Sequence, residues 1–100
     1  MAERIIVYWR DIPAQVIVRQ GRRAEKRELS KRFIEAIDCC AMRTGSKDSD
    51  AYLADWRKAA PEPCEGDLAA EADAVVAALE QTYDEVRLRN LVEAGGRERV

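Results

Sequence analysis

The apolar residues among the first 20 positions follow the two-residue period of β-strands. Two such stretches, residues 5–9 and 15–19, are separated by Asp-Ile-Pro-Ala at 11–14, which we expect to connect them as a hairpin. Successive side chains of a strand point to opposite faces. One face of the hairpin would carry Ile5, Val7, Trp9, Val16 and Val18, and the other Ile6, Tyr8 and Ile17 beside several arginines.

Three helices are expected after the hairpin, because the apolar positions then repeat with the helical period. The first covers residues 25–42 and carries one apolar stripe. The second covers residues 51–59 and ends before the prolines at 61 and 63, which lack an amide proton. The third has the clearest pattern and runs from residue 68 to about 94, with Asp67 as its cap.

Together these elements predict an α+β fold, with an N-terminal β-hairpin followed by three helices packed on one face. Residues 1–96 would form a single domain, and residues 97–100 a frayed C-terminal tail. Three helices can shield only one side of a two-stranded ribbon, which leaves its other side for a partner. We therefore expect a partner-binding surface made of Ile6, Tyr8, Arg10, Ile17 and Arg19.

Charge adds a second candidate surface. Charged residues make up 36% of the chain, and the stretch from residue 19 to 32 holds seven basic residues against two acidic ones. Its secondary basic patch, at the start of the expected first helix, consists of Arg22, Arg23, Lys26 and Arg27. This patch could be a solvated helix start, a contact for a protein or small anion, or a weak nucleic-acid site. The net charge of −2 argues against a dedicated nucleic-acid binder.

The residue types that usually carry catalysis are missing or poorly spaced. The chain has no histidine, which removes the usual base of serine and cysteine hydrolases and the histidine ligands of zinc sites. Its five glycines match no phosphate-binding loop. We therefore expect no enzyme activity, no metal and no cofactor. A thiol-dependent redox or metal function stays open as an alternative, with Cys39 and Cys64 as the thiol candidates.

Two segments of the chain resemble a known family. They read Ile5-Ile6-Val7-Tyr8-Trp9-Arg10-Asp11-Ile12-Pro13-Ala14-Gln15-Val16 and Asp50-Ala51-Tyr52-Leu53-Ala54-Asp55-Trp56-Arg57-Lys58. Both resemble a small bacterial family called "virulence factor", which is similar to the C-terminal domain of larger conserved virulence factor proteins with helical repeats. The resemblance covers most of the chain through Lys58. It implies no established reaction, cofactor or catalytic residue, and it implies an accessory role, because stand-alone members occur near folate and corrinoid one-carbon genes.

The functional expectation is a small accessory module that binds a protein partner or self-associates through the hairpin. No apolar run approaches the roughly 18 residues that a membrane span needs. The N-terminus also lacks the apolar segment and cleavage site of a secretory signal. We therefore expect a cytoplasmic protein with reduced thiols and no membrane partner.

Overall fold

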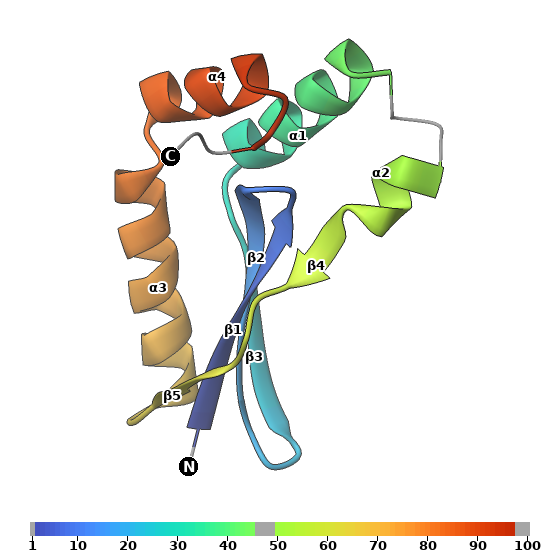
Figure 1. Cartoon of the computed structure of the whole chain (residues 1–100). Helices are drawn as coiled ribbons and strands as arrows, with labels where there is room; N and C mark the ends of the chain where they lie inside the picture. Colours follow the sequence, from blue (N-terminus) through green and yellow to red (C-terminus); the bar gives the residue numbers. More distant parts are fainter. Residues whose placement is uncertain (1, 46–49, 98–100) are drawn as a thin grey trace.

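The computed structural model describes residues 2–45 and 50–97. Its strands are β1 (Ala2–Trp9), β2 (Ile12–Gln20), β3 (Arg23–Glu28), β4 (Trp56–Lys58) and β5 (Glu62–Cys64). Its helices are α1 (Lys31–Arg43), α2 (Asp50–Ala54), α3 (Leu68–Thr82) and α4 (Glu85–Glu93). The strands form one antiparallel sheet in the order β3-β2-β1-β4, and β5 also pairs with β1 (Figure 1).

The predicted α+β class and the N-terminal hairpin are confirmed, but the predicted arrangement is confirmed only in part. Where the pattern predicted one hairpin and three helices, the described residues form a five-stranded sheet and four helices. The predicted tail, residues 97–100, lies outside the described residues except for Arg97. No helix in the described part of the chain is long and apolar enough to cross a membrane.

The turn between β1 and β2 is shorter than the sequence suggested. Trp9 pairs directly with Ile12, so Arg10 and Asp11 alone make the turn, and residues 12–14 belong to β2. Arg10 enters the left-handed region with φ 54°, which allows so tight a reversal. Pro13 fits within the strand because the register shifts beside it, between Val7 and Tyr8. The proline that indicated a loop therefore lies at a bulge.

This register corrects the predicted faces of the hairpin. Ile6 lies opposite Val16, and Ile5 lies opposite Ile17. Directly opposed residues of an antiparallel pair share a face, so Ile6 belongs with Val16 and Val18. The alternation within each strand predicts instead that Ile5 shares a face with Val16. A shift of one residue moves a whole strand's side chains to the other face, and the turn that sets this shift could not be read from the alternation within each strand.

The predicted start of the first helix is instead the edge strand β3. It pairs with β2 along its whole length, and Gly21, with φ +61°, opens the turn between them. The side chain of Arg27 reaches Asp73 on α3, with 3.0 Å between Nε and Oδ1. The charged sequence of β3 favours no strand by itself, so pairing with β2 and cover from α3 outweigh local propensity. The basic patch therefore lies on a hairpin and an edge strand.

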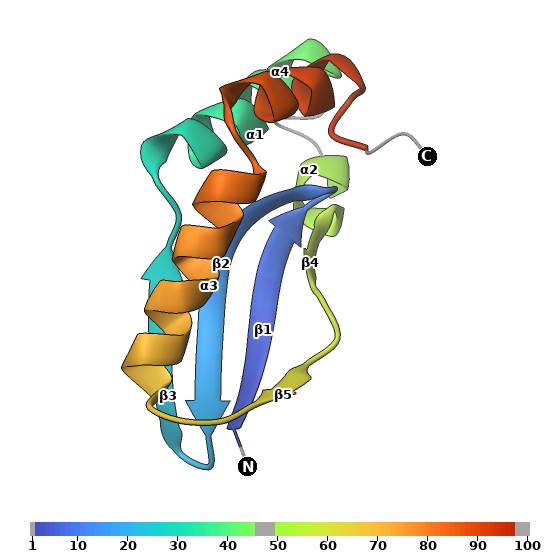
Figure 2. The ribbon, with the colours of Figure 1, turned by 90° about the vertical axis from the view of Figure 1, so that its left-hand side faces the viewer.

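Two apolar clusters account for the core. The first lies between α3 and one face of the sheet, as Figure 2 shows, and contains Ala2, Val16, Val18, Leu68, Ala72 and Val75. The second lies where β1 and β2 meet α1 and α4 at the end of the sheet. Its largest side chains are Trp9, Ile12, Phe33, Ile37 and Tyr83.

The long C-terminal helix of the prediction is two helices. α3 ends at Thr82, and α4 starts after Asp84, whose side chain accepts a hydrogen bond from the Arg87 amide at 2.9 Å. Between them, Tyr83 leaves the helical region and its buried ring packs edge-on against Phe33. The apolar period runs on through this break and hid the Asp84 cap. The second predicted helix, residues 51–59, is likewise α2 followed by β4.

Glu80 of α3 provides the acceptor at the start of α1. Its carboxylate accepts hydrogen bonds from the Ser30 amide at 2.7 Å and the Ser30 hydroxyl at 2.8 Å, and it pairs with Arg32 at 2.9 Å. Partial burial acts to raise the pKa of Glu80, but the contacts with Ser30 and Arg32 outweigh it and hold this pKa below its ordinary value. An acid from another helix thus takes the place of a local side-chain cap.

Glu80→Gln is therefore expected to destabilise the protein at neutral pH. A carboxyl group whose pKa is lowered by folding contributes its full stabilisation of the folded state at a pH above its unfolded pKa, about 4.3 for glutamate. This stabilisation is lost as the pH falls through the pKa of the folded state. Urea midpoints of wild type and Glu80→Gln should differ at pH 7 and converge as the pH falls through the lowered folded pKa of Glu80. Glu93→Gln, at an exposed position of α4, is the control and should match wild type at pH 7. A constant gap between wild type and Glu80→Gln at every pH would contradict the assignment.

Candidate functional site

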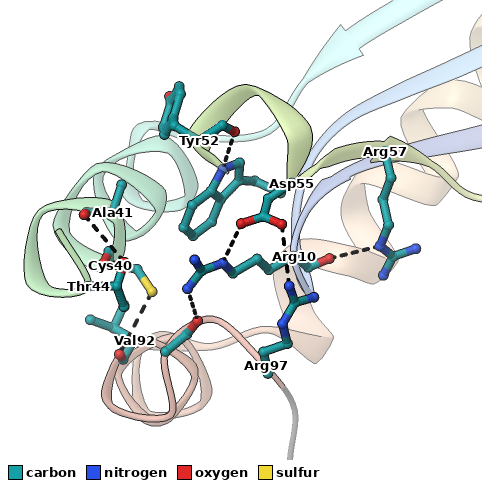
Figure 3. A network of polar contacts seen from close by, with 11 residues as sticks. Arg10, Cys40, Ala41, Thr44, Tyr52, Asp55, Arg57, Val92 and Arg97 are labelled. Atoms are coloured by element: carbon teal, nitrogen blue, oxygen red, sulfur yellow. Dashed lines mark hydrogen bonds and ion pairs between the residues drawn. The ribbon is translucent and has the colours of Figure 1, made fainter. Parts of the chain in front are cut away.

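Arg10 ties two distant segments of the chain to the β1–β2 turn (Figure 3). Its Nε donates to Asp55 Oδ2 at 2.9 Å, and its Nη1 donates to the Gly95 carbonyl at 2.6 Å. Its backbone amide also donates to the Asp55 carbonyl at 3.0 Å. The Arg10 and Asp55 side chains are only 14% and 20% exposed, so this ion pair is shielded from water and salt more than a surface pair would be.

Two further arginines complete what we call the Arg10 network. Arg97 pairs with Asp55 at 3.3 Å, so one carboxylate serves two guanidinium groups. Arg57 donates from Nε to the Arg10 carbonyl at 3.0 Å and pairs with Asp11 at 3.2 Å. The network holds together the turn, the α2–β4 junction and the segment after α4. Its polar groups are occupied by one another, which is the arrangement of a structural joint.

The Arg10 network rests on tightly packed groups. The Arg10 guanidinium lies 4.6 Å from the centre of the buried Trp9 ring, close enough for a cation–π contact. The Trp9 Nε1–H donates to the Tyr52 carbonyl at 2.9 Å. Burial raises the pKa of the neighbouring Cys40 thiol, although the Arg10 charge opposes this effect. The thiolate that nucleophilic chemistry requires is thus disfavoured at Cys40.

The five residues of the predicted partner-binding surface do not form one surface. Ile6 faces α3 and packs against its cluster. The Tyr8 ring lies under the Arg57 guanidinium, 4.5 Å from its carbon. Arg10 belongs to the network described above. Ile17 and Arg19 remain, on the sheet face that turns away from α3.

At the end of that second sheet face, Tyr52 of α2 packs against Trp9 and Trp56. We call the remainder of the face the open face, because no helix among the described residues covers it (Figure 1). Strand register places its side chains in rows that cross the sheet. The rows are Ala24–Arg19–Glu3, then Lys26–Ile17–Ile5, then Glu28–Gln15–Val7–Lys58. Ile5 is buried yet belongs to neither apolar cluster, and Val7 and Ile17 are half-buried. The centre of the open face is thus aliphatic and its margins are charged.

The charge of the open face is positive. Arg19, Lys26 and Lys58 stand against Glu3 and Glu28, a sum of +1, and Arg22 in the adjoining turn brings it to +2. Arg19 and Glu3 neutralise each other at 3.3 Å. Lys26 and Lys58 are exposed and form no ion pair with the residues that the structure describes. Lys26 belongs to the basic patch predicted from the sequence, whereas Lys58 does not, because only strand pairing brings β4 to this face.

A shallow groove lies on the covered side of the sheet. Its volume is about 240 Å³, and its lining residues are Arg4, Ile6, Glu71, Ala74, Val75, Ala78 and Leu79. Arg4 at its margin is paired with Glu62 at 2.8 Å and Glu71 at 3.5 Å. The hydrogen bond to Glu62 raises the pKa of Arg4, so this group stays charged and engaged. The groove therefore offers apolar space without a free polar group.

The thiol candidates are far apart. Cys39 is exposed on α1 and Cys64 is half-buried in β5, at opposite ends of the molecule (Figure 1). Burial, with Glu71 nearby, raises the pKa of the Cys64 thiol. In residues 2–45 and 50–97 no three Cys, Asp or Glu side chains gather as a metal site would require. Among the described residues, neither candidate thiol therefore belongs to a group of side chains that could hold a metal ion.

Comparison with known proteins identifies one family. The family model described as "Virulence factor" matches residues 7–92. That range includes Arg10, Asp55 and Arg57 of the Arg10 network, but not Gly95 or Arg97. It also includes most of the open face, all of α3, and α4 except its last residue. Neither the curated proteins nor the solved structures gave a match.

Proposed function

The chain belongs to the virulence-factor family, and from this premise we propose that it is a protein-interaction module that binds a different protein on its open face. The single observation that supports this proposal is the aliphatic centre of that face. An antiparallel sheet whose second face meets water usually alternates apolar inward residues with polar outward ones. Here Ile5, Val7 and Ile17 occupy the outward positions at the centre.

A different protein is a better occupant than a second copy of the chain. Two open faces packed against each other would bring together two surfaces that each carry a net positive charge. Like charges in a partly dehydrated interface cost free energy, so such a dimer would oppose its own formation. The one-carbon setting that the family resemblance implies makes enzymes of folate or corrinoid chemistry the first partners to examine.

Site-directed photo-crosslinking in the native cell tests the proposal. A photoreactive residue at Gln15, on the open face, should give a discrete adduct with another protein. The same residue at Ala77, exposed on α3, should not. The double substitution Val7→Thr and Ile17→Thr keeps β-branched side chains and removes apolar contact, so it should abolish the Gln15 adduct while leaving the far-ultraviolet spectrum unchanged. Adducts that are absent at Gln15, or that survive the double substitution, would refute the proposal.

A further inference from the structure

We infer that the partner presents an acidic surface with an apolar centre, an inference that rests on the proposed docking at the open face. The chain as a whole is acidic, with a net charge of −2, yet its open face is positive. A face whose sign opposes that of the whole protein selects partners of the opposite charge and speeds their encounter.

The positions of Lys26 and Lys58 indicate where the carboxylates of a partner would lie. Lys26 lies on β3 at one edge of the open face, and Lys58 lies on β4 at the other. Their strands are three sheet spacings apart, or about 15 Å, and the aliphatic residues Ile17, Ile5 and Val7 lie between them. A complementary surface would therefore carry carboxylates about 15 Å apart on either side of an apolar ridge.

The remaining charges of the open face do not cancel this pattern. Glu3 is neutralised by Arg19 at 3.3 Å. Glu28 is the other acid of the face, and it shares a row with Lys58 at the opposite edge. In the turn before β3, Arg22 adds a positive charge beside the open face, whereas Arg23 pairs with Gln20 and lies on the other face of the sheet. The excess of positive charge thus lies toward the β2–β3 turn.

An acidic protein fits these features better than a nucleic acid does. Proteins that bind single strands offer aromatic rings for base stacking along a continuous basic track. The three rows of the open face contain no aromatic residue, and the tryptophans of the next row, Trp9 and Trp56, pack into the core cluster. Lys26 and Lys58, which form no ion pair with the described residues, lie at separate edges with an aliphatic strip between them. Apolar centre and charged rim are instead the usual layout of a protein–protein interface.

Charge reversal on the full-length chain tests the inference. The double variant Lys26→Glu/Lys58→Glu is compared with Lys31→Glu/Arg89→Glu, which changes the net charge equally at exposed positions of α1 and α4. The probe is the photoreactive residue at Gln15 in both backgrounds. We expect the first variant to give at least tenfold less adduct than wild type, and the second to give the same yield as wild type. We also expect the cross-linked segment of the partner to be net acidic. Raising the salt concentration should weaken the wild-type adduct.

The outcomes separate the inference from the proposed function. An adduct that resists Lys26→Glu/Lys58→Glu, or a cross-linked segment without acidic residues, would overturn the acidic partner and leave docking at the open face intact. A nuclease-sensitive adduct would assign the face to nucleic acid, and an adduct with a second copy of the chain would assign it to self-association, so either would overturn the inference. Absence of any adduct at Gln15 in the wild-type background would refute the proposed function itself.

Discussion

Gly96→Ala is expected to destabilise the protein by about 3 kcal/mol, and Gly95→Ala by only about 1 kcal/mol. Both glycines have positive φ, +75° at Gly95 and +81° at Gly96, so both pay a backbone penalty on gaining a side chain. Only Gly96 is also crowded. A Cβ there would lie 3.0 Å from Arg10 Cδ and 3.2 Å from both Cys40 Sγ and Trp9 Cζ3.

The crowding at Gly96 has no easy relief, because its neighbours are fixed. Arg10 is held by its bonds to Asp55 and Gly95, and Trp9 is fully buried. At Gly95 the nearest atoms are 3.9 Å and 4.0 Å from the added Cβ, which is ordinary contact. In thermal unfolding, the midpoint temperature should fall by roughly 10–20 °C in Gly96→Ala and by about 5 °C in Gly95→Ala. Equal shifts for the two variants would contradict close packing at Gly96.

The elements that sequence analysis predicted well are those fixed by local patterns. The apolar period from residue 68 onward located the start of α3 at its cap, Asp67, whose side chain accepts from the Ala70 amide at 3.0 Å. The alternation near the N-terminus located β1 and β2. In each case the physical cause lies within a few residues of the element itself.

The elements that were missed depend on distant parts of the chain. β3 reads as a charged helix start, and only its pairing with β2 and its contact with α3 make it a strand. At the break between α3 and α4, the Tyr83 ring packs edge-on against Phe33, which is distant in the sequence. Local propensity amounts to less than about 1 kcal/mol per residue, so tertiary packing readily reverses it.

The candidate surface was anticipated in part. Ile17, Arg19 and Lys26 were named from the sequence and do lie on the open face. Ile6, Tyr8 and Arg10 were named with them because a two-stranded hairpin was expected, and the extra strands and the register place them elsewhere. Lys58 could not be found, because nothing in its neighbours along the chain indicates that β4 pairs with β1.

The Arg10 network and the open face are linked through β1. This strand carries Ile5 and Val7 at the centre of the open face and ends at Trp9, beneath Arg10. The network also fixes the α2–β4 junction through Asp55, which leads into Lys58. A joint at the end of the sheet thus holds the β4 edge of the open face against β1, and a preorganised face loses less entropy on binding.

Arg10→Ala is therefore expected to cost about 3 kcal/mol of stability, and Arg10→Gly about 2 kcal/mol. Both variants remove the hydrogen bonds to Asp55 and to the Gly95 carbonyl. Breaking a fully buried ion pair costs about 3–5 kcal/mol, and the residual exposure of Arg10 and Asp55, 14% and 20%, lowers this cost. Alanine keeps the unfavourable φ of 54° and glycine does not, which separates the two variants by about 1 kcal/mol.

Urea unfolding of the two variants measures both the loss of the Arg10 hydrogen bonds and the backbone strain at this position. Arg57→Ala is the control: this side chain is 47% exposed and donates to the Arg10 carbonyl from outside the network's buried part, so its loss should cost less than about 1 kcal/mol. If Arg10→Gly proved no more stable than Arg10→Ala, the left-handed turn would carry no strain. If both matched Arg57→Ala, the Arg10–Asp55 pair would not hold the joint, and the register of β4 against β1 would have to come from backbone pairing alone.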